Sequence, residues 1–254
     1  MPYQLNNTEQ KKITEIESKS YMKPIIKLLY QHINGQRNKK EGWKSAFNNL
    51  HELLVKAKPL VDKILKKRAK KGELKDIKQA RKNIAGNAFS KLLEYVFIQN
   101  KLQENIKADI FITSQKSKVK NFDTIATINV DGETQKPDCD LIIYSLKKNN
   151  DIKKCIILSL KTSLRERAGQ TYKWKLLMEI ASSENSIKEK YNISYNPHEM
   201  PIVCFATVNF YDEINNPQHR GMFKFFDKSF IAKNVNKDFI SPLSEIINFV
   251  NLSL

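Results

Sequence analysis

Residues 136–161 read KPDCDLIIYSLKKNNDIKKCIILSLK, and this stretch decides the fold. Two apolar runs, at 141–144 and 155–160, lie on either side of a polar turn at 147–151. Short apolar runs that are bounded by turn residues are typical of buried β-strands. The sequence therefore predicts a strand hairpin inside the core, with acidic residues before its first strand and Lys161 at the end of its second.

The charged residues of this hairpin are expected to meet at one end. Side chains two residues apart in a strand face the same side, so Asp138 shares a face with Asp140, and Ser159 shares one with Lys161. If the strands pair, a carboxylate and an ammonium group converge there. Carboxylate oxygens are natural ligands of Mg²⁺, and a lysine is costly to bury without partners. These features predict a metal-dependent centre for phosphodiester hydrolysis.

The rest of the chain alternates between helical and strand-like patterns. Apolar residues recur at helical spacing within 8–80, 77–99 and 168–190. Strands are expected at 110–113, 125–130, 201–208 and 222–226. This order predicts an α/β (α+β) fold with a central mixed β-sheet flanked by helices.

Composition indicates a basic protein with a substantial core. The 254 residues are 41% hydrophobic, and 44 Lys and Arg against 27 Asp and Glu give a net charge of +17. Such a charge favours polyanions, with nucleic acid as the first candidate and an anionic membrane surface as the second. No apolar run approaches the ~20 residues that span a bilayer, and no apolar signal segment opens the chain. We therefore expect an intracellular, cytoplasmic protein without a membrane partner.

One interval is unusually basic. Residues 56–82 contain twelve Lys or Arg and three acids. A solvated helix surface and a phosphate-contacting face explain such a run equally well.

The central hairpin resembles a known family. Pro137-Asp138, followed by a strand that ends Ser159-Leu160-Lys161, resembles the PD-(D/E)xK nuclease superfamily. Residues 161–167, KTSLRER, are similar to the K-x-(S/T)-x-R-(D/E)-R signature of type II restriction endonucleases that recognise sites containing CC or GG. The resemblance implies a restriction-endonuclease-like core at 81–254, a helical basic N-terminal region at 1–80, and Mg²⁺ as the cofactor.

The resemblance also assigns roles to the acidic residues. It makes Asp138 the metal-binding carboxylate, Lys161 the catalytic lysine and Glu94 the helix-borne glutamate that contacts metal-bound water. Asp140 competes with Asp138 for the metal, because both face the same way and Asp140 leads directly into the strand.

One position departs from the plain pattern of the superfamily. Ser159 stands where Asp or Glu is expected, as it often does in the restriction enzymes with the Arg-Glu-Arg motif. The missing carboxylate then comes from the following helix. Its first glutamate is Glu179, about one turn later than that group implies, and Glu179 is therefore the predicted catalytic and metal-binding substitute.

The residues after Lys161 are expected to read DNA. An arginine can donate two hydrogen bonds to guanine O6 and N7, and a glutamate can accept one from cytosine N4. The tripeptide Arg165-Glu166-Arg167 can therefore read G·C pairs. The alternative interpretation is an ion pair at a helix start, which contributes little. Ser163, in the same signature, and Arg220, in a later polar loop, are predicted to contact DNA as well.

The resulting hypothesis is a type II restriction endonuclease. It hydrolyses both strands of double-stranded DNA with Mg²⁺, at a short palindromic, G·C-containing site, which implies a homodimer. A structure-specific repair or resolvase nuclease of the same fold is an alternative, although it does not need the Arg-Glu-Arg tripeptide. A non-catalytic basic DNA-binding protein leaves the carboxylate–lysine convergence unexplained, and a membrane-surface binder lacks a suitable amphipathic segment.

Overall fold

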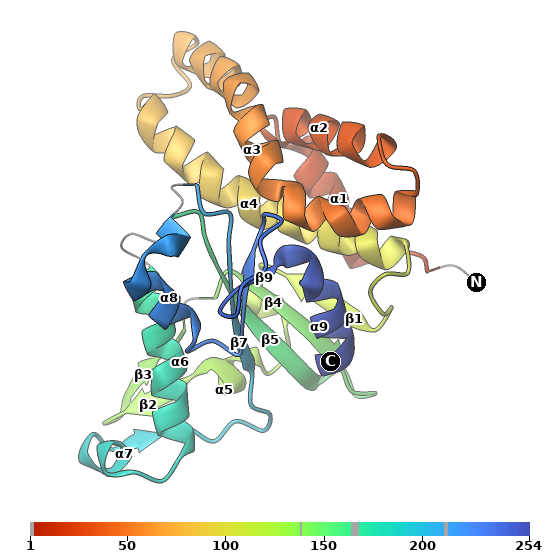
Figure 1. Ribbon diagram of the computed structural model, residues 1–254. Helices are drawn as coiled ribbons and strands as arrows, with labels where there is room; N and C mark the ends of the chain where they lie inside the picture. The colour runs from red at the N-terminus through yellow and green to blue at the C-terminus, as the bar shows by residue number, and fades with distance from the viewer. Residues whose placement is uncertain (1–2, 138, 164–167, 211–212) are drawn as a thin grey trace.

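The N-terminal region is helical. The computed structural model describes residues 3–137, 139–163, 168–210 and 213–254. Within these ranges the chain opens with helices α1 (Asn7–Ser18), α2 (Met22–Asn34), α3 (Lys39–Lys70) and α4 (Ile77–Leu102). Figure 1 shows α3 and α4 as a long antiparallel pair that crosses the molecule above the sheet and extends beyond it.

Polar residues and one glycine set the ends of these helices. Asn6 accepts a hydrogen bond from the N–H of Glu9, whose side chain accepts one from the N–H of Asn6, so α1 begins with a capping box. Asp76 caps α4 by accepting from the N–H of Gln79. Gly72, between α3 and α4, has a φ of +75°, which glycine adopts without strain. These residues close α3 and open α4 as a helical hairpin.

The central sheet is mixed and has six described strands in the order β1-β4-β5-β7-β8-β9. Their bounds are β1 (Ile110–Thr113), β4 (Leu141–Leu146), β5 (Ile152–Lys161), β7 (Ile202–Thr207), β8 (Lys228–Ile231) and β9 (Ser241–Pro242). β4 pairs antiparallel with β1 on one side and β5 on the other, and the pairs from β5 to β9 are parallel. The predicted hairpin therefore lies in the middle of the sheet.

The remaining elements surround this sheet. The helices are α5 (Phe122–Ala126), α6 (Ala168–Ser182), α7 (Ser186–Lys190), α8 (Pro217–Phe223) and α9 (Ile246–Ser253). A small antiparallel sheet contains β2 (Ile128–Val130), β3 (Glu133–Gln135) and β6 (Ile193–Ser194). Single 3-10 turns are η1 (Lys116–Lys118), η2 (Glu213–Asn215) and η3 (Leu243–Glu245). In Figure 1 the small sheet and α7 lie at the end of α6 that is far from α3 and α4.

Each face of the central sheet is buried in its own core. Ile143 and Leu158 pack with residues of the N-terminal helices and of α9. Their neighbours Ile142 and Ile157 point the other way and pack with residues of α5, α6 and α8. Helices on both faces explain why these strands are almost continuously apolar.

One strand prediction is wrong, and another is wrong in part. Residues 222–226 include the end of α8, and the strand begins only at Lys228. Asn216 caps α8 and Pro217 takes its first turn, and this pairing of residues starts a helix. Residues 125 and 126 likewise belong to α5, so the strand there is confined to β2.

The predicted class is confirmed as a mixed α/β fold with a central mixed sheet, flanking helices and a helical N-terminal region. The division at residue 80 stays a prediction. Helix α4 runs across that position, and its buried residues share a core with the sheet. None of the described helices combines the length and the apolarity that a membrane span requires.

Candidate active site

Lys161 and Asp140 meet at the end of β5. The register of the β4–β5 hairpin sets Asp140 opposite Ser159. The Oδ2 atom of Asp140 accepts a hydrogen bond from the backbone N–H of Leu160 at 2.7 Å and lies 3.4 Å from Nζ of Lys161. The structure thus brings a carboxylate and an ammonium group together at the strand end, and we call them the Lys161–Asp140 pair.

The Lys161–Asp140 pair is open to solvent in part. The side chain of Lys161 is 10% exposed and that of Asp140 is 35% exposed. Leu158 and Leu160 point into the core of the N-terminal helices, so the alternate residues Ser159 and Lys161 face the side of α6. Ser159 is buried and neutral, so it supplies no anionic ligand. An accessible carboxylate beside an ammonium group can hold a hard cation and a phosphate oxygen.

Glu94 lies near the same end of the sheet, but its contacts are different. Its Oε1 accepts from the N–H of Ser114, directly after β1, at 3.3 Å and lies 3.7 Å from Nζ of Lys12. The side chain is fully buried, and Oε2 has no hydrogen-bond partner among the described residues. Burial raises the pKa of Glu94, and the Lys12 ammonium opposes this shift. No contact described for Glu94 includes the Lys161–Asp140 pair.

Glu179 lies away from the Lys161–Asp140 pair. Its carboxylate is 3.3 Å from Nζ of Lys175, which also binds Asp227 at 2.9 Å. Asp227 accepts from the N–H of Val203 near the start of β7, whereas Lys161 lies beside the last residue of β7. The structure therefore does not bring Glu179 to the carboxylate position that a serine occupies in β5.

Glu213 is a carboxylate that the sequence analysis missed. The hydroxyl of Ser163 donates to its carboxylate at 3.3 Å, and the Thr162 carbonyl accepts from the N–H of Phe210. These contacts join the segment after β5 to the segment after β7. Parallel neighbouring strands end at the same edge of a sheet, so polar residues after both apolar runs were a usable sequence indication.

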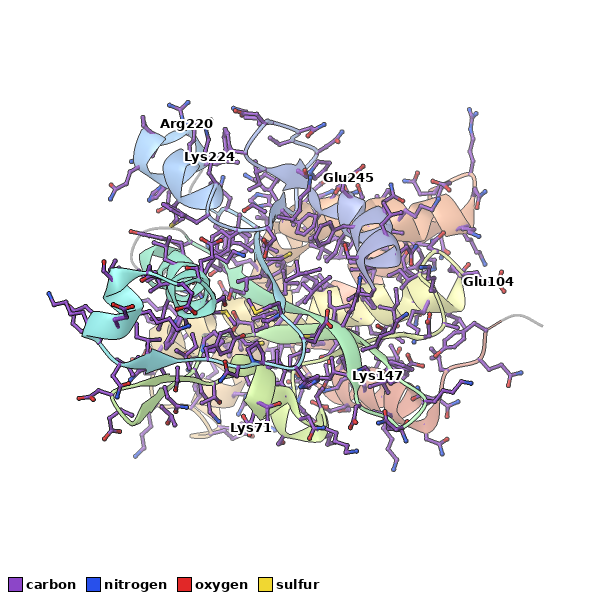
Figure 2. All side chains as sticks on the ribbon, turned by 90° about the horizontal axis from the view of Figure 1, so that it is seen from below. Lys71, Glu104, Lys147, Arg220, Lys224 and Glu245 are labelled. Atoms are coloured by element: carbon purple, nitrogen blue, oxygen red, sulfur yellow. The ribbon has the colours of Figure 1, made fainter. Side chains whose placement is uncertain are left out.

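Of the predicted DNA contacts, Arg220 lies on the surface. It is exposed on α8, and Figure 2 shows it with Lys224 at the edge of the molecule. Its neighbour His219 forms a hydrogen bond with the carbonyl of Glu213, whose side chain accepts from Ser163. Four predicted site residues lie outside the described ranges: Asp138, Arg165, Glu166 and Arg167.

Comparison with known families agrees with this geometry. Residues 115–249, just over half of the chain, match a family described as BsaWI restriction endonuclease type 2. The chain belongs to this family. The matched range includes β4 to β9, both members of the Lys161–Asp140 pair and Glu213, and it leaves out α1 to α4.

A more local similarity links this restriction endonuclease family member to an archaeal protein. A Methanocaldococcus jannaschii protein with the name "Putative type II restriction enzyme MjaVIP" is 44% identical over 52 residues. The match covers 20% of this chain and 23% of that relative, so the chain spans less than a quarter of the relative's length. The similarity is therefore confined to one segment.

Restriction endonucleases generally need a divalent metal ion, and the donor atoms of the site fit one. The described residues contain no group of three or more His, Cys, Asp or Glu that could enclose a metal. Mg²⁺ is usually bound through one or two carboxylates, with water and phosphate oxygens as the other ligands. The partly exposed carboxylate of Asp140 suits such an open site.

Proposed function

We propose that this protein is a type II restriction endonuclease that hydrolyses one phosphodiester bond in each strand of double-stranded DNA. The observation that carries the proposal is the Lys161–Asp140 pair at the end of β5, inside the region that matches the restriction endonuclease family. The net charge of +17 supports a polyanionic substrate.

The proposed chemistry uses Mg²⁺ and the groups around the pair. When bound, Mg²⁺ acidifies an attacking water and offsets the charge that grows on the phosphate. Asp138 and Asp140 are its proposed ligands. The Nζ of Lys161 donates to a phosphate oxygen and stabilises the negative charge of the transition state.

A helix-borne carboxylate completes the proposal. Glu94 takes this role, supported by its raised pKa and by the Oε2 atom that has no partner among the described residues. Glu179 is left out, because it pairs with Lys175, which also binds Asp227 near the start of β7, whereas Lys161 lies beside the end of β7.

Recognition of the DNA sequence is proposed for the segment that follows β5. The tripeptide Arg165-Glu166-Arg167 reads G·C pairs through the major groove, and Ser163 and Arg220 contact the DNA nearby. The contact between Ser163 and Glu213 supports this arrangement, because it holds the start of the segment next to α8. A palindromic, G·C-containing site then requires two copies of the chain related by two-fold symmetry.

Digestion of a plasmid of known sequence, followed by mapping of the ends, tests this function. The proposal expects discrete fragments whose ends share one palindrome, a requirement for Mg²⁺, and no fragments from Lys161→Ala. Ends that occur only at junctions or flaps point to a structure-specific nuclease of the same fold. Binding without any cleavage points to a non-catalytic DNA-binding protein.

A further inference from the structure

The distal part of the α3–α4 hairpin carries positive charge that the proposed cleavage site does not use. Residues 56–82, which we call the basic arm, contain twelve Lys or Arg against three acids, a net charge of +9. The whole chain carries +17, so the other residues together contribute +8. Just over half of the net charge thus lies in about a tenth of the chain.

Most charges of the basic arm are exposed and lack a counter-charge. Three of the twelve, Lys56, Arg68 and Arg81, form ion pairs with acidic neighbours. The other nine are exposed and form no ion pair with any residue that the structure describes. Like charges so close together repel one another, and a bound polyanion relieves that repulsion.

The basic arm projects from the main core. Buried residues that belong to this core end at Ala57 on α3 and resume at Ala88 on α4. Between these two positions, only Val61 and Leu65 are buried. The part of α3 beyond Ala57 is about 20 Å long at 1.5 Å per residue. Figure 1 shows it extending past the sheet and away from α1 and α2.

The part of α3 that precedes the basic arm contacts the end of the sheet where Lys161 lies. On α3, Nδ1 of His51 is 2.7 Å from the carbonyl oxygen of Val208, the residue after β7. The His51 ring is 5.5 Å from the ring of Phe210, whose N–H donates to the carbonyl of Thr162, directly after Lys161. From this contact α3 continues outward into the basic arm.

We propose that the basic arm binds the phosphate backbone of the DNA duplex outside the cleaved sequence. This inference rests on the proposed function, which places DNA at the Lys161–Asp140 pair. Lysine–phosphate contacts carry no sequence information, so the arm adds affinity for all duplexes and does not choose the site. Lys71, directly after α3, and Arg220, on α8, lie at opposite edges of the molecule in Figure 2, so the two surfaces are separate.

The test compares two sets of four lysines that are changed to glutamine. The arm variant changes Lys66, Lys67, Lys70 and Lys71, which are exposed at the end of α3. The control changes Lys147, Lys148, Lys153 and Lys154, which are exposed at the turn of the β4–β5 hairpin, the end opposite Lys161. Both variants remove the same charge, and a third changes the four arm lysines to arginine and keeps it.

Binding is measured by fluorescence anisotropy without divalent metal, on a short and a long mixed-sequence duplex, over a series of NaCl concentrations. On the long duplex, the plot of log affinity against log salt is expected to lose about 3.6 units of slope in the glutamine arm variant, since each of the four lost phosphate contacts removes about 0.9. The control and the arginine variant keep the wild-type slope. On the short duplex, which offers fewer phosphates to the arm, the glutamine arm variant is expected to lose less slope.

An arm variant with the wild-type slope on the long duplex overturns the inference, and so does a control that loses as much slope. Far-ultraviolet circular dichroism and thermal melting confirm that each variant is folded. Failure of the proposed function is seen separately, as absence of plasmid cleavage by the wild-type protein with metal. That result leaves this metal-free comparison unaffected.

Discussion

Lys101 and Lys161 both face a carboxylate, but only one of these two pairs is open to solvent. The side chains of Lys101, on α4, and Glu9, on α1, are 0% and 8% exposed. In the Lys161–Asp140 pair the corresponding fractions are 10% and 35%. A closed pair can only hold two elements together, whereas an open pair can exchange its partner for a metal ion or a phosphate.

The surroundings of Lys101 show what a structural pair requires. Its Nζ lies 4.7 Å from the ring centre of Tyr3 and 4.3 Å from that of Phe111, and these aromatic faces stabilise the cation. Burial lowers the pKa of Lys101, while the hydrogen bond to Glu9 opposes this shift. Glu9 also belongs to the capping box of α1. The pair therefore fastens α1 to α4, and the difference between the two pairs lies in their access and not in their residue types.

Removal of the open lysine is expected to have the largest effect. Lys161→Ala deletes the ammonium group that we propose to stabilise the transition state, and we expect plasmid cleavage to fall by about 10³-fold. The melting temperature is expected to change little, because Lys161 ends its strand at a partly exposed position. Cleavage at the wild-type rate by this variant contradicts the catalytic role.

Removal of the closed lysine is expected to affect stability instead. Lys101→Met leaves Glu9 buried without its partner, and the free energy of unfolding is expected to fall by about 3–5 kcal/mol in urea titrations. The double variant Glu9→Gln with Lys101→Met is expected to regain a large part of this loss. Folded Lys101→Met protein is expected to cleave at the wild-type rate. A rate as low as that of Lys161→Ala would contradict the purely structural role of the Lys101–Glu9 pair.

A smaller loss is expected at the carboxylate of the open pair. Asp140→Asn keeps an oxygen for the N–H of Leu160 but removes the charge that would hold the metal. Cleavage is expected to fall on the order of 10²-fold and to recover in part at high Mg²⁺ concentration. Asp138→Asn, measured in parallel, identifies the principal metal ligand as the residue with the larger loss. Wild-type cleavage by Asp140→Asn removes this residue from the site.

The smallest effect on stability is expected at Glu15, a partly exposed residue of α1 that forms an ion pair with Lys91 of α4. Burial acts to raise its pKa, but hydrogen bonds from Lys91 and Lys12 outweigh it and lower the pKa from 4.5 to about 2. Because the folded-state pKa is lowered, Glu15 stabilises the fold above pH 4.5, and this contribution is lost as the pH falls towards 2. The side chain is 41% exposed, so solvent screening limits the contribution to about 1 kcal/mol or less.

The measurement for Glu15 is the urea midpoint of the wild type and of Glu15→Gln at two pH values. The two midpoints are expected to differ at pH 7 and to approach each other when the pH is lowered through the range between the two pKa values. An equal difference at both pH values contradicts the assignment of the pKa shift to the ion pairs.

The central hairpin was predictable from the sequence because its information is local. Apolar runs on either side of a turn define β4 and β5, and the two-residue period of a strand sets Asp140 and Lys161 on one face. The start of α8 carried an equally local pattern, an Asn followed by a Pro. The apolar residues from Met222 to Phe226 favour a strand instead and obscure this pattern.

The other features depend on contacts between distant parts of the chain. Glu213 lies beside Ser163 only because β7 pairs in parallel with β5 and both strands end at the same edge. Glu179 is the first glutamate of the helix after β5, but that part of α6 lies near the start of β7, where Lys175 pairs with both Glu179 and Asp227. The contact of Lys101 with Glu9 joins two helices that are far apart in the sequence, and no local pattern indicates it.

The proposed difference between the pairs is that the Lys161–Asp140 pair takes part in DNA cleavage and the Lys101–Glu9 pair does not. Its most direct test is digestion of one plasmid with Mg²⁺ by equal folded amounts of wild type, Lys161→Ala and Lys101→Met, with the ends mapped by sequencing. The same discrete ends are expected from the wild type and Lys101→Met, and intact plasmid is expected from Lys161→Ala. Cleavage by Lys161→Ala at those same ends would contradict the proposed difference.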